Sequence, residues 1–124
     1  MKVAVPTERQ EQISFVKWFR LSFPKKRIIA IPNGVATNAL FGRALNQEGR
    51  SRGVPDLFIP HLLVWIEMKR RDYKRPKTTP KMGTTAWYQK DWEDYLMLCG
   101  HTVFRAAGWI DAKEFIEEYY ILKN

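Results

Sequence analysis

Cysteine and histidine are scarce in this chain, which has one cysteine and two histidines in 124 residues. A single cysteine cannot form a disulfide within one chain, so we expect a reduced, cytoplasmic setting with Cys99 packed inside an apolar run. His61 and His101 have no His or Cys partner at zinc-ligand spacing, and we expect no metal role for either.

Long apolar segments are also missing. The longest, residues 57–66, is interrupted by Pro60 and His61. The N-terminal residues do not combine a positive head, an apolar core and a small-residue cleavage site. We therefore expect neither a membrane span nor a secretion signal.

Acidic residues are outnumbered by basic ones, 13 against 21, which gives a formal net charge of +8. The excess is local, since residues 69–81 hold seven basic residues and one acidic residue, whereas the last sixteen residues are mildly acidic. A concentrated basic segment suits a polyanionic partner such as DNA, because each Lys or Arg on a phosphate releases condensed counterions.

With 45% hydrophobic residues, the chain can build a core, and we expect a single domain over residues 1–124. Apolar periodicity and turn signals predict helices at residues 7–22, 84–99 and 111–120 and strands at 27–31, 56–59, 63–69 and 102–106. Residues 33–52 are predicted as a long surface loop with one helical turn near 38–46, and residues 70–83 as an exposed loop. The expected fold is α/β, a mixed four-stranded sheet flanked by helices.

The aromatic residues of the predicted helices recur at helical spacing, which indicates core positions. We expect this for Phe15, Trp18, Phe19, Trp87, Trp92 and Tyr95, with base stacking left open for Trp87. The predicted buried face of the helix at 84–99 also includes Tyr88, Leu96, Leu98 and Cys99. Asn33 and Gly34 are predicted to form a turn, with a contact of Asn33 to DNA or the active site left open.

Two short motifs lie on neighbouring predicted strands. Asp56 follows Pro55 at the start of one strand, and the triplet Glu67-Met68-Lys69 closes the next, eleven positions after Asp56. Strand alternation places the side chains of Glu67 and Lys69 on one face of the sheet. Carboxylates are the ligands that magnesium prefers, and a neighbouring ammonium can orient water or stabilise transition-state charge.

The combination of these motifs with their flanking residues resembles the virus-type replication-repair nuclease domain (VRR-NUC) of the PD-(D/E)XK superfamily. The resemblance rests on Ile31-Pro32-Asn33-Gly34, Arg52-Gly53-Val54-Pro55-Asp56-Leu57-Phe58, Ile66-Glu67-Met68-Lys69, Gln89, Trp92 and Gly108, in the family's order. It implies a restriction-endonuclease-like αβββαβ core, Mg²⁺- or Mn²⁺-dependent DNA cleavage, and phage proteins of this length that act as homodimers on branched DNA. The expected setting is then the host cytoplasm.

The resemblance also implies roles for individual residues. Asp56 and Glu67 correspond to metal-binding carboxylates, the Met68 carbonyl to a backbone ligand, and Lys69 and Gln89 to catalytic residues. The family also places a glutamate at the start of the first helix, four residues before a glutamine. Glu8 with Gln12 fits this spacing, and Glu11 is the alternative.

The basic residues beside the expected site are predicted to contact the DNA backbone. They are Arg50, Arg52, Arg70, Arg71, Lys74, Arg75 and Lys77. Taken singly, each site residue also has an ordinary structural explanation, such as a turn, an ion pair or a solvated helix surface. The leading hypothesis is an endonuclease of branched DNA, with Holliday-junction resolution as one form of it. The alternatives are a less structure-selective or flap- or end-processing nuclease and a DNA-binding subunit of a repair complex.

Overall fold

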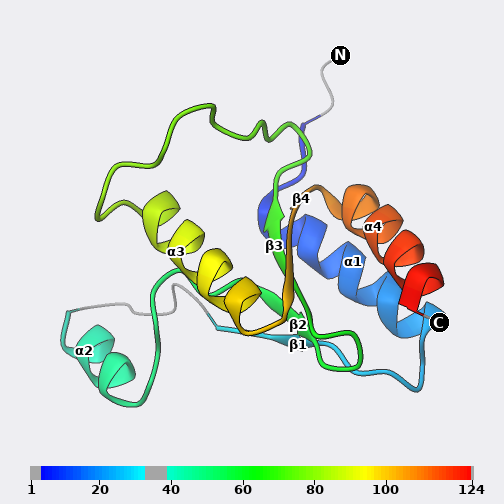
Figure 1. Ribbon diagram of the computed structural model, residues 1–124, viewed down its shortest axis with the longest axis horizontal. Coiled ribbons are helices and arrows are strands. Elements are labelled where there is room, and N and C mark those ends of the chain that lie inside the picture. Colours follow the sequence, from blue (N-terminus) through cyan, green and yellow to red (C-terminus); the bar gives the residue numbers. More distant parts are fainter. Residues whose placement is uncertain (1–3, 33–38, 124) are drawn as a thin grey trace.

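A four-stranded mixed sheet forms the middle layer of the computed structural model, which describes residues 4–32 and 39–123 (Figure 1). Its strands lie side by side in chain order: β1 (Ile29–Ala30), β2 (Leu57–Ile59), β3 (Val64–Lys69) and β4 (Thr102–Ala107). The β1–β2 and β2–β3 pairs are antiparallel, and β4 runs parallel to β3. A parallel neighbour requires a crossover connection, and α3 (Thr85–Leu98) supplies it.

Helices cover both faces of this sheet. The helices α1 (Glu8–Ser22) and α4 (Trp109–Lys123) pack together on one face and α3 lies on the other, whereas α2 (Ala39–Gln47) stands apart (Figure 1). The expected mixed α/β architecture is therefore confirmed. None of the helices in residues 4–32 and 39–123 is long and apolar enough to cross a membrane.

The core lies between the sheet and the α1–α4 layer. Val64, Ile66 and Met68 alternate along β3 and are fully buried, and Phe15 and Phe19 of α1 pack in the same cluster. Because strand side chains alternate between faces, the intervening Glu67 and Lys69 point toward α3. This alternation keeps the polar residues of β3 out of the core.

The first helix begins as the sequence predicts. The Thr7 hydroxyl accepts a hydrogen bond from the Gln10 backbone N–H at 3.1 Å, and the Gln10 side chain accepts one from the Thr7 N–H at 2.9 Å. This reciprocal capping box satisfies two otherwise unpaired donors at the helix start. It also fixes the first turn, which carries Glu8 and Glu11.

Several boundaries differ from the sequence prediction. The strand predicted at 27–31 pairs over only two residues, and the region predicted as a loop with one helical turn contains the nine-residue α2. The last helix starts at Trp109, directly after Gly108, and runs to Lys123 instead of spanning 111–120. The turn predicted at Asn33 and Gly34 lies outside the described residues.

The prediction for the buried face of α3 is wrong in part. Tyr95 is 56% and Leu98 87% exposed, Cys99 is exposed as well, and the buried residues of the helix are Glu93 and Leu96. Gln89, Glu93 and Leu96 share the stripe that faces the sheet. Gln89 and Glu93 bond to polar residues of the sheet. The buried face of α3 is therefore partly polar, and apolar periodicity did not identify it.

Candidate active site

Asp56 and Glu67 lie next to each other at the ends of paired strands. The register that pairs Leu57 with Ile66 places the preceding Asp56 beside the following Glu67. Asp56 Oδ2 accepts a hydrogen bond from the Met68 backbone N–H at 2.9 Å, and its carbonyl accepts one from the Ile31 N–H at 2.8 Å. The Asp56 carboxylate is thus held against the strand that carries Glu67.

Gln89 of α3 connects Glu67 with Lys69. Its Nε2 donates a hydrogen bond to Glu67 Oε1 at 3.0 Å, and its Oε1 accepts one from Lys69 Nζ at 3.0 Å. Lys69 Nζ lies 3.6 Å from Glu67 Oε1. The amide therefore fixes both charged groups, and the structure brings together four residues that the sequence analysis selected: Asp56, Glu67, Lys69 and Gln89.

The two carboxylates lie close together, with Glu67 buried and Asp56 partly buried. Glu67 is 5% exposed, and burial together with the neighbouring charge of Asp56 raises the pKa of Glu67 to about 8, although Lys69 opposes the shift. Burial also raises the pKa of Asp56, against the hydrogen bond from Met68 and the charge of Lys69. Two such carboxylates are stabilised in their ionised form by a cation placed between them.

The donor chemistry of these residues fits Mg²⁺ or Mn²⁺, which prefer oxygen ligands. Asp56 and Glu67 offer carboxylate oxygens. The Met68 N–H points toward Asp56, and the Lys69 carbonyl accepts a hydrogen bond from the Gly108 N–H on the opposite side of β3. Because the N–H and C=O of one strand residue point to the same side, the Met68 carbonyl lies on the side of β3 that Asp56 occupies. The described residues contain no group of three or more His, Cys, Asp or Glu side chains that could hold a metal.

The two glutamates at the start of α1 have different surroundings. Glu11 is 1% exposed, and its carboxylate accepts hydrogen bonds from the Arg71 guanidinium at 2.9 and 3.0 Å and from the Trp109 N–H at 3.4 Å. The hydrogen bonds from Arg71 lower the pKa of Glu11. Glu8 is exposed, and its charge contributes to the raised pKa of both Asp56 and Glu67.

Glu11 therefore has a structural explanation of its own. Gly108 adjoins it with a φ of +89°, and a Cβ added there would lie 2.9 Å from Glu11 Oε2 and from Arg71 Cβ. The contact joins α1 to the end of β3 and the start of α4. Glu11 is occupied by its ion pair with Arg71. Glu8 is the candidate glutamate whose charge acts on Asp56 and Glu67.

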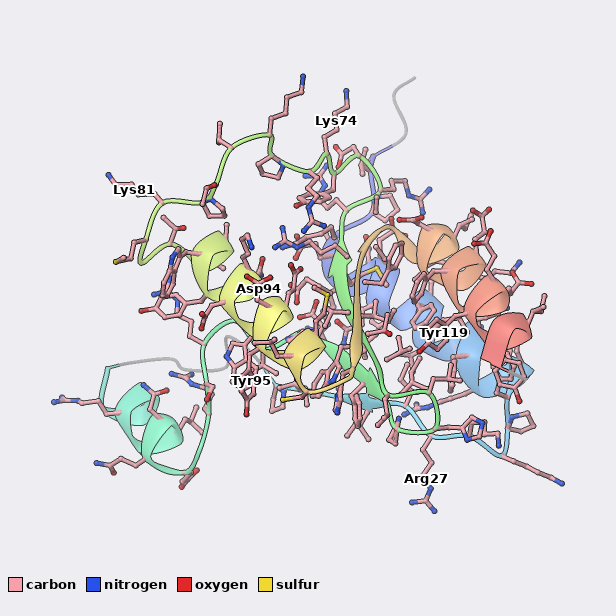
Figure 2. The ribbon with its side chains drawn as sticks, viewed as in Figure 1. Arg27, Lys74, Lys81, Asp94, Tyr95 and Tyr119 are labelled. Carbon is pink, nitrogen blue, oxygen red and sulfur yellow. The ribbon has the colours of Figure 1, made fainter. Side chains whose placement is uncertain are left out.

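The basic residues predicted to contact DNA fall into two groups. Several already have partners: Arg50 with Asn46 and the Gly42 carbonyl, Arg52 with Thr85 and the Tyr88 ring, Arg70 with Asp72, Arg71 with Glu11, and Arg75 with Glu93. Lys74 and Lys77 are exposed on the loop between β3 and α3. Lys74 points away from the body of the molecule (Figure 2).

Sequence reasoning missed a second polar cluster beside the site. Arg105 of β4 is the register partner of Glu67. Its Nε donates a hydrogen bond to Glu93 of α3, and a terminal nitrogen donates one to the Tyr73 hydroxyl at 3.0 Å. The available signals were an arginine inside an apolar strand and a glutamate four residues after Gln89 on the same helix.

Gly53 lets the chain approach α3 at the residue before Gln89. Its φ is +90°, and a Cβ added there would lie 2.5 Å from the Tyr88 backbone carbonyl carbon. The segment leading to Asp56 is therefore packed directly on the backbone that positions Gln89. This close approach requires glycine.

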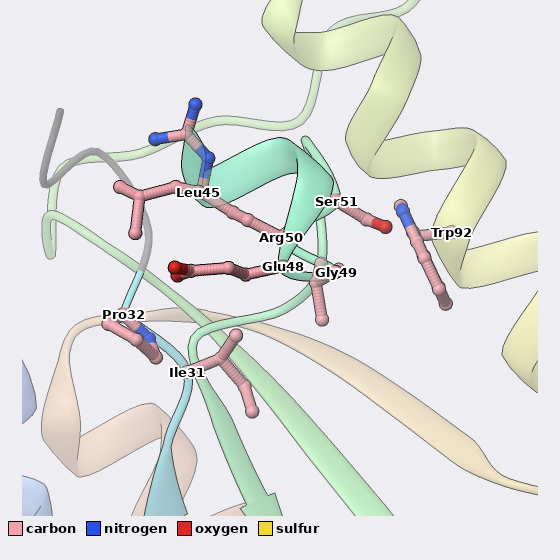
Figure 3. Close-up of a pocket in the computed structure, with 9 residues that line it drawn as sticks. Ile31, Pro32, Leu45, Glu48, Gly49, Arg50, Ser51 and Trp92 are labelled. Carbon is pink, nitrogen blue, oxygen red and sulfur yellow. The ribbon is translucent and has the colours of Figure 1, made fainter. Parts of the chain in front are cut away.

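A cavity of about 560 Å³ lies between α2, the end of β1 and α3 (Figure 3). Ile31, Leu45 and Trp92 contribute its apolar lining, and Arg50 borders it. Asp56 and Glu67 are not among the described residues that line it. The cavity is therefore separate from the carboxylate pair.

Comparison of the chain with protein-family models, with curated proteins and with solved structures gave no match.

Proposed function

We propose that this protein is a divalent-metal-dependent DNA endonuclease with a PD-(D/E)XK core of the VRR-NUC type, acting on branched DNA. The observation that carries the proposal is the convergence of Asp56, Glu67, Lys69 and Gln89 on one edge of the sheet. Asp56 directly precedes β2, Glu67 and Lys69 belong to β3, and Gln89 belongs to α3. Gln89 bonds to Glu67 and Lys69 at 3.0 Å, and Asp56 accepts a hydrogen bond from the Met68 backbone N–H at 2.9 Å. The sequence motifs and the local basic charge point to the same chemistry.

Each residue has a distinct task in this proposal. Asp56, Glu67 and the Met68 carbonyl would hold the ion. When bound, Mg²⁺ or Mn²⁺ neutralises charge on the scissile phosphate and acidifies a water molecule. Lys69 stabilises the negative charge that develops on the phosphoryl oxygens, and Gln89 holds the Lys69 ammonium toward the reacting group.

A non-catalytic DNA-binding subunit is less well supported. A protein that only binds DNA gains nothing from placing two adjacent carboxylates, one of them buried, beside a basic surface: ionised they repel phosphate, and protonated they offer no charge for the DNA to pair with. Such a pair is costly unless a cation compensates it. We therefore favour catalysis over binding alone.

Cleavage assays test the proposal. Purified protein is incubated with a labelled four-way junction, a flap and a blunt duplex in Mg²⁺, Mn²⁺ or EDTA. We expect metal-dependent cleavage that Asp56→Asn and Glu67→Gln reduce by at least about a hundredfold. Glu114→Gln, an exposed change on α4, serves as the control and should cut like the parent; binding without cleavage under every condition would refute the proposal.

The oligomeric state of the protein distinguishes a junction-cutting enzyme from a flap-cutting one. Symmetric cleavage of a four-way junction requires two active sites, so the proposal includes a homodimer. Light scattering of the free protein and of its junction complex should give two protomers. A monomer that cuts flaps and leaves junctions intact would favour the flap-processing alternative.

A further inference from the structure

A pocket of about 280 Å³ lies between α3 and the loop of residues 70–83, which we call the basic loop. The loop arches from the end of β3 to the start of α3 (Figure 1). The residues of interest in the lining are Tyr73, Arg75, Lys77, Gln89, Lys90 and Arg105. We call this cavity the loop pocket.

The loop pocket adjoins the candidate active site through a shared residue. Gln89 lines the pocket and also bonds to Glu67 and Lys69 at 3.0 Å. Arg105, on the other side, is the register partner of Glu67. A group bound in the pocket therefore lies about one side chain away from the carboxylate pair.

The pocket is a built structure that a buried ion pair supports. The Arg105 side chain is 7% exposed, and its bonds to Glu93 and Tyr73 tie β4 to α3 and to the basic loop. A terminal nitrogen of Arg75 lies 3.5 Å from the other carboxylate oxygen of Glu93, Oε2. These contacts fix the position of the basic loop relative to α3.

The charge of the lining suits an anion. Arg75, Lys77, Lys90 and Arg105 provide four cationic groups, and the carboxylates paired with them are those of Glu93 and Asp94. Two positive charges remain in excess. The hydroxyls of Thr78 and Thr79 add hydrogen-bond donors of the kind that contact phosphate oxygens.

We infer that the loop pocket binds one nucleotide of an unpaired DNA strand, through its backbone phosphate, beside the phosphate that is cut. The inference rests on the proposed function and adds the substrate class. A pocket of this volume, enclosed between a loop and a helix, admits a single nucleotide and excludes the full width of a duplex. The preferred substrate then carries a single-stranded segment next to the cleavage point.

Two charge reversals on the basic loop test the inference. Lys77 lines the pocket, whereas Lys81, exposed on the same loop, is not among the described residues that line it. The Lys81 side chain points outward from the molecule (Figure 2). Binding of a short labelled oligothymidylate and of a blunt duplex is measured by anisotropy in EDTA at several salt concentrations. Lys77→Glu should weaken oligothymidylate binding about tenfold and lower the salt slope by about one, and Lys81→Glu should have a smaller effect on both.

A second variant fills the pocket without changing charge. Ala86 lines it near the start of α3, so Ala86→Phe should weaken oligothymidylate binding and spare the duplex. Ala44→Phe places the same side chain on exposed α2 and should bind like the parent. Circular dichroism melting confirms that each variant is folded before it is used.

The outcomes separate the inference from the proposed function. Equal effects of Lys77→Glu and Lys81→Glu, or equal losses on single strand and duplex, would overturn the loop pocket as an unpaired-strand site even if the parent protein cuts DNA. Absence of cleavage by the parent protein under every metal refutes the proposed function, whatever the binding ratios.

Discussion

Glu67 is the residue on which the proposed chemistry depends most. It lies near the end of β3 beside Asp56, contacts Lys69 and Gln89, and is nearly inaccessible to solvent. A carboxylate in such a place is stable only when protonated or when paired with positive charge. Its protonation should therefore be visible in the stability of the metal-free protein.

The first prediction concerns this pH dependence. The pKa of Glu67 rises from 4.5 to about 8 on folding because of burial and the charge of Asp56. Below pH 4.5 both states hold the proton. Between 4.5 and 8 the unfolded chain ionises first, so the free energy of unfolding falls by up to about 1.4 kcal/mol per pH unit, and above 8 the effect is constant.

Urea unfolding of the parent protein and of Glu67→Gln in EDTA measures the effect. The glutamine variant should gain stability relative to the parent as pH rises through this window, by roughly 2–4 kcal/mol at its alkaline end. Added Mg²⁺ should stabilise the parent and not the variant. Parallel stability profiles for the two proteins would contradict the electrostatic description of the site.

The second prediction separates Glu8 from Glu11. Glu11→Gln weakens the ion pair between buried Glu11 and exposed Arg71 and should cost about 1–2 kcal/mol of stability. Glu8→Gln, on the exposed first turn, should change stability by less than about 0.5 kcal/mol. Cleavage by Glu8→Gln should require more Mg²⁺, whereas Glu11→Gln should keep the parent's Mg²⁺ requirement; the reverse pattern would assign the ligand to Glu11.

The residues of the candidate site were predictable from sequence to different degrees. Asp56, Glu67 and Lys69 follow from strand alternation and the hairpin spacing. Glu93 and Arg105 were not predicted, because each looks like a solvated charge until the crossover helix is placed over β4. An arginine inside an apolar strand and a glutamate one turn after Gln89 were visible in the sequence, but nothing local indicates that they pair across twelve positions.

At the scale of elements, strands were easier to predict than the orientation of α3. Alternation along β3 fixes which side chains enter the core, since a shift of one residue would bury Glu67 and Lys69 among apolar groups. Helix α3 carries apolar residues around most of its circumference, and the stripe facing the sheet includes Gln89 and Glu93. Tertiary partners decided its orientation, which periodicity alone cannot supply.

The third prediction tests the close contact between the Asp56 segment and α3. Gly53→Ala introduces a Cβ 2.5 Å from the Tyr88 backbone, whereas Gly49→Ala introduces one with nothing within 4 Å at a similar positive φ. Both changes cost about 1–2 kcal/mol of backbone strain. Gly53→Ala should lose a further 1–3 kcal/mol, roughly, and reduce cleavage, because Gln89 follows the displaced residue.

Thermal melting and cleavage rates of the two alanine variants give the comparison. Equal losses of stability and of activity in both would show that the contact with Tyr88 does not position the site.

At the scale of the whole molecule, the sheet divides the architecture into two sides. The basic loop and the candidate active site lie at the α3 side of the sheet, and α1 and α4 cover the other (Figure 1). The fourth prediction follows from this division. Lys74→Glu on the basic loop should weaken DNA binding and lower its salt slope, and Lys17→Glu on α1 should leave both nearly unchanged.

Anisotropy titrations of a labelled four-way junction over a range of salt concentrations provide this measurement. Equal losses for the two variants would place the DNA on no particular side.

Single-turnover cleavage of a labelled branched DNA by the parent protein and by Lys69→Met tests the central claim most directly. Lys69 contacts both Glu67 and Gln89, so its replacement should lower the Mg²⁺-dependent rate by about a hundredfold or more while DNA binding changes by only a few fold. A Lys69→Met protein that cuts at the parent's rate, or a parent protein that cuts equally well in EDTA, would contradict the assignment of this site as a metal-dependent nuclease centre.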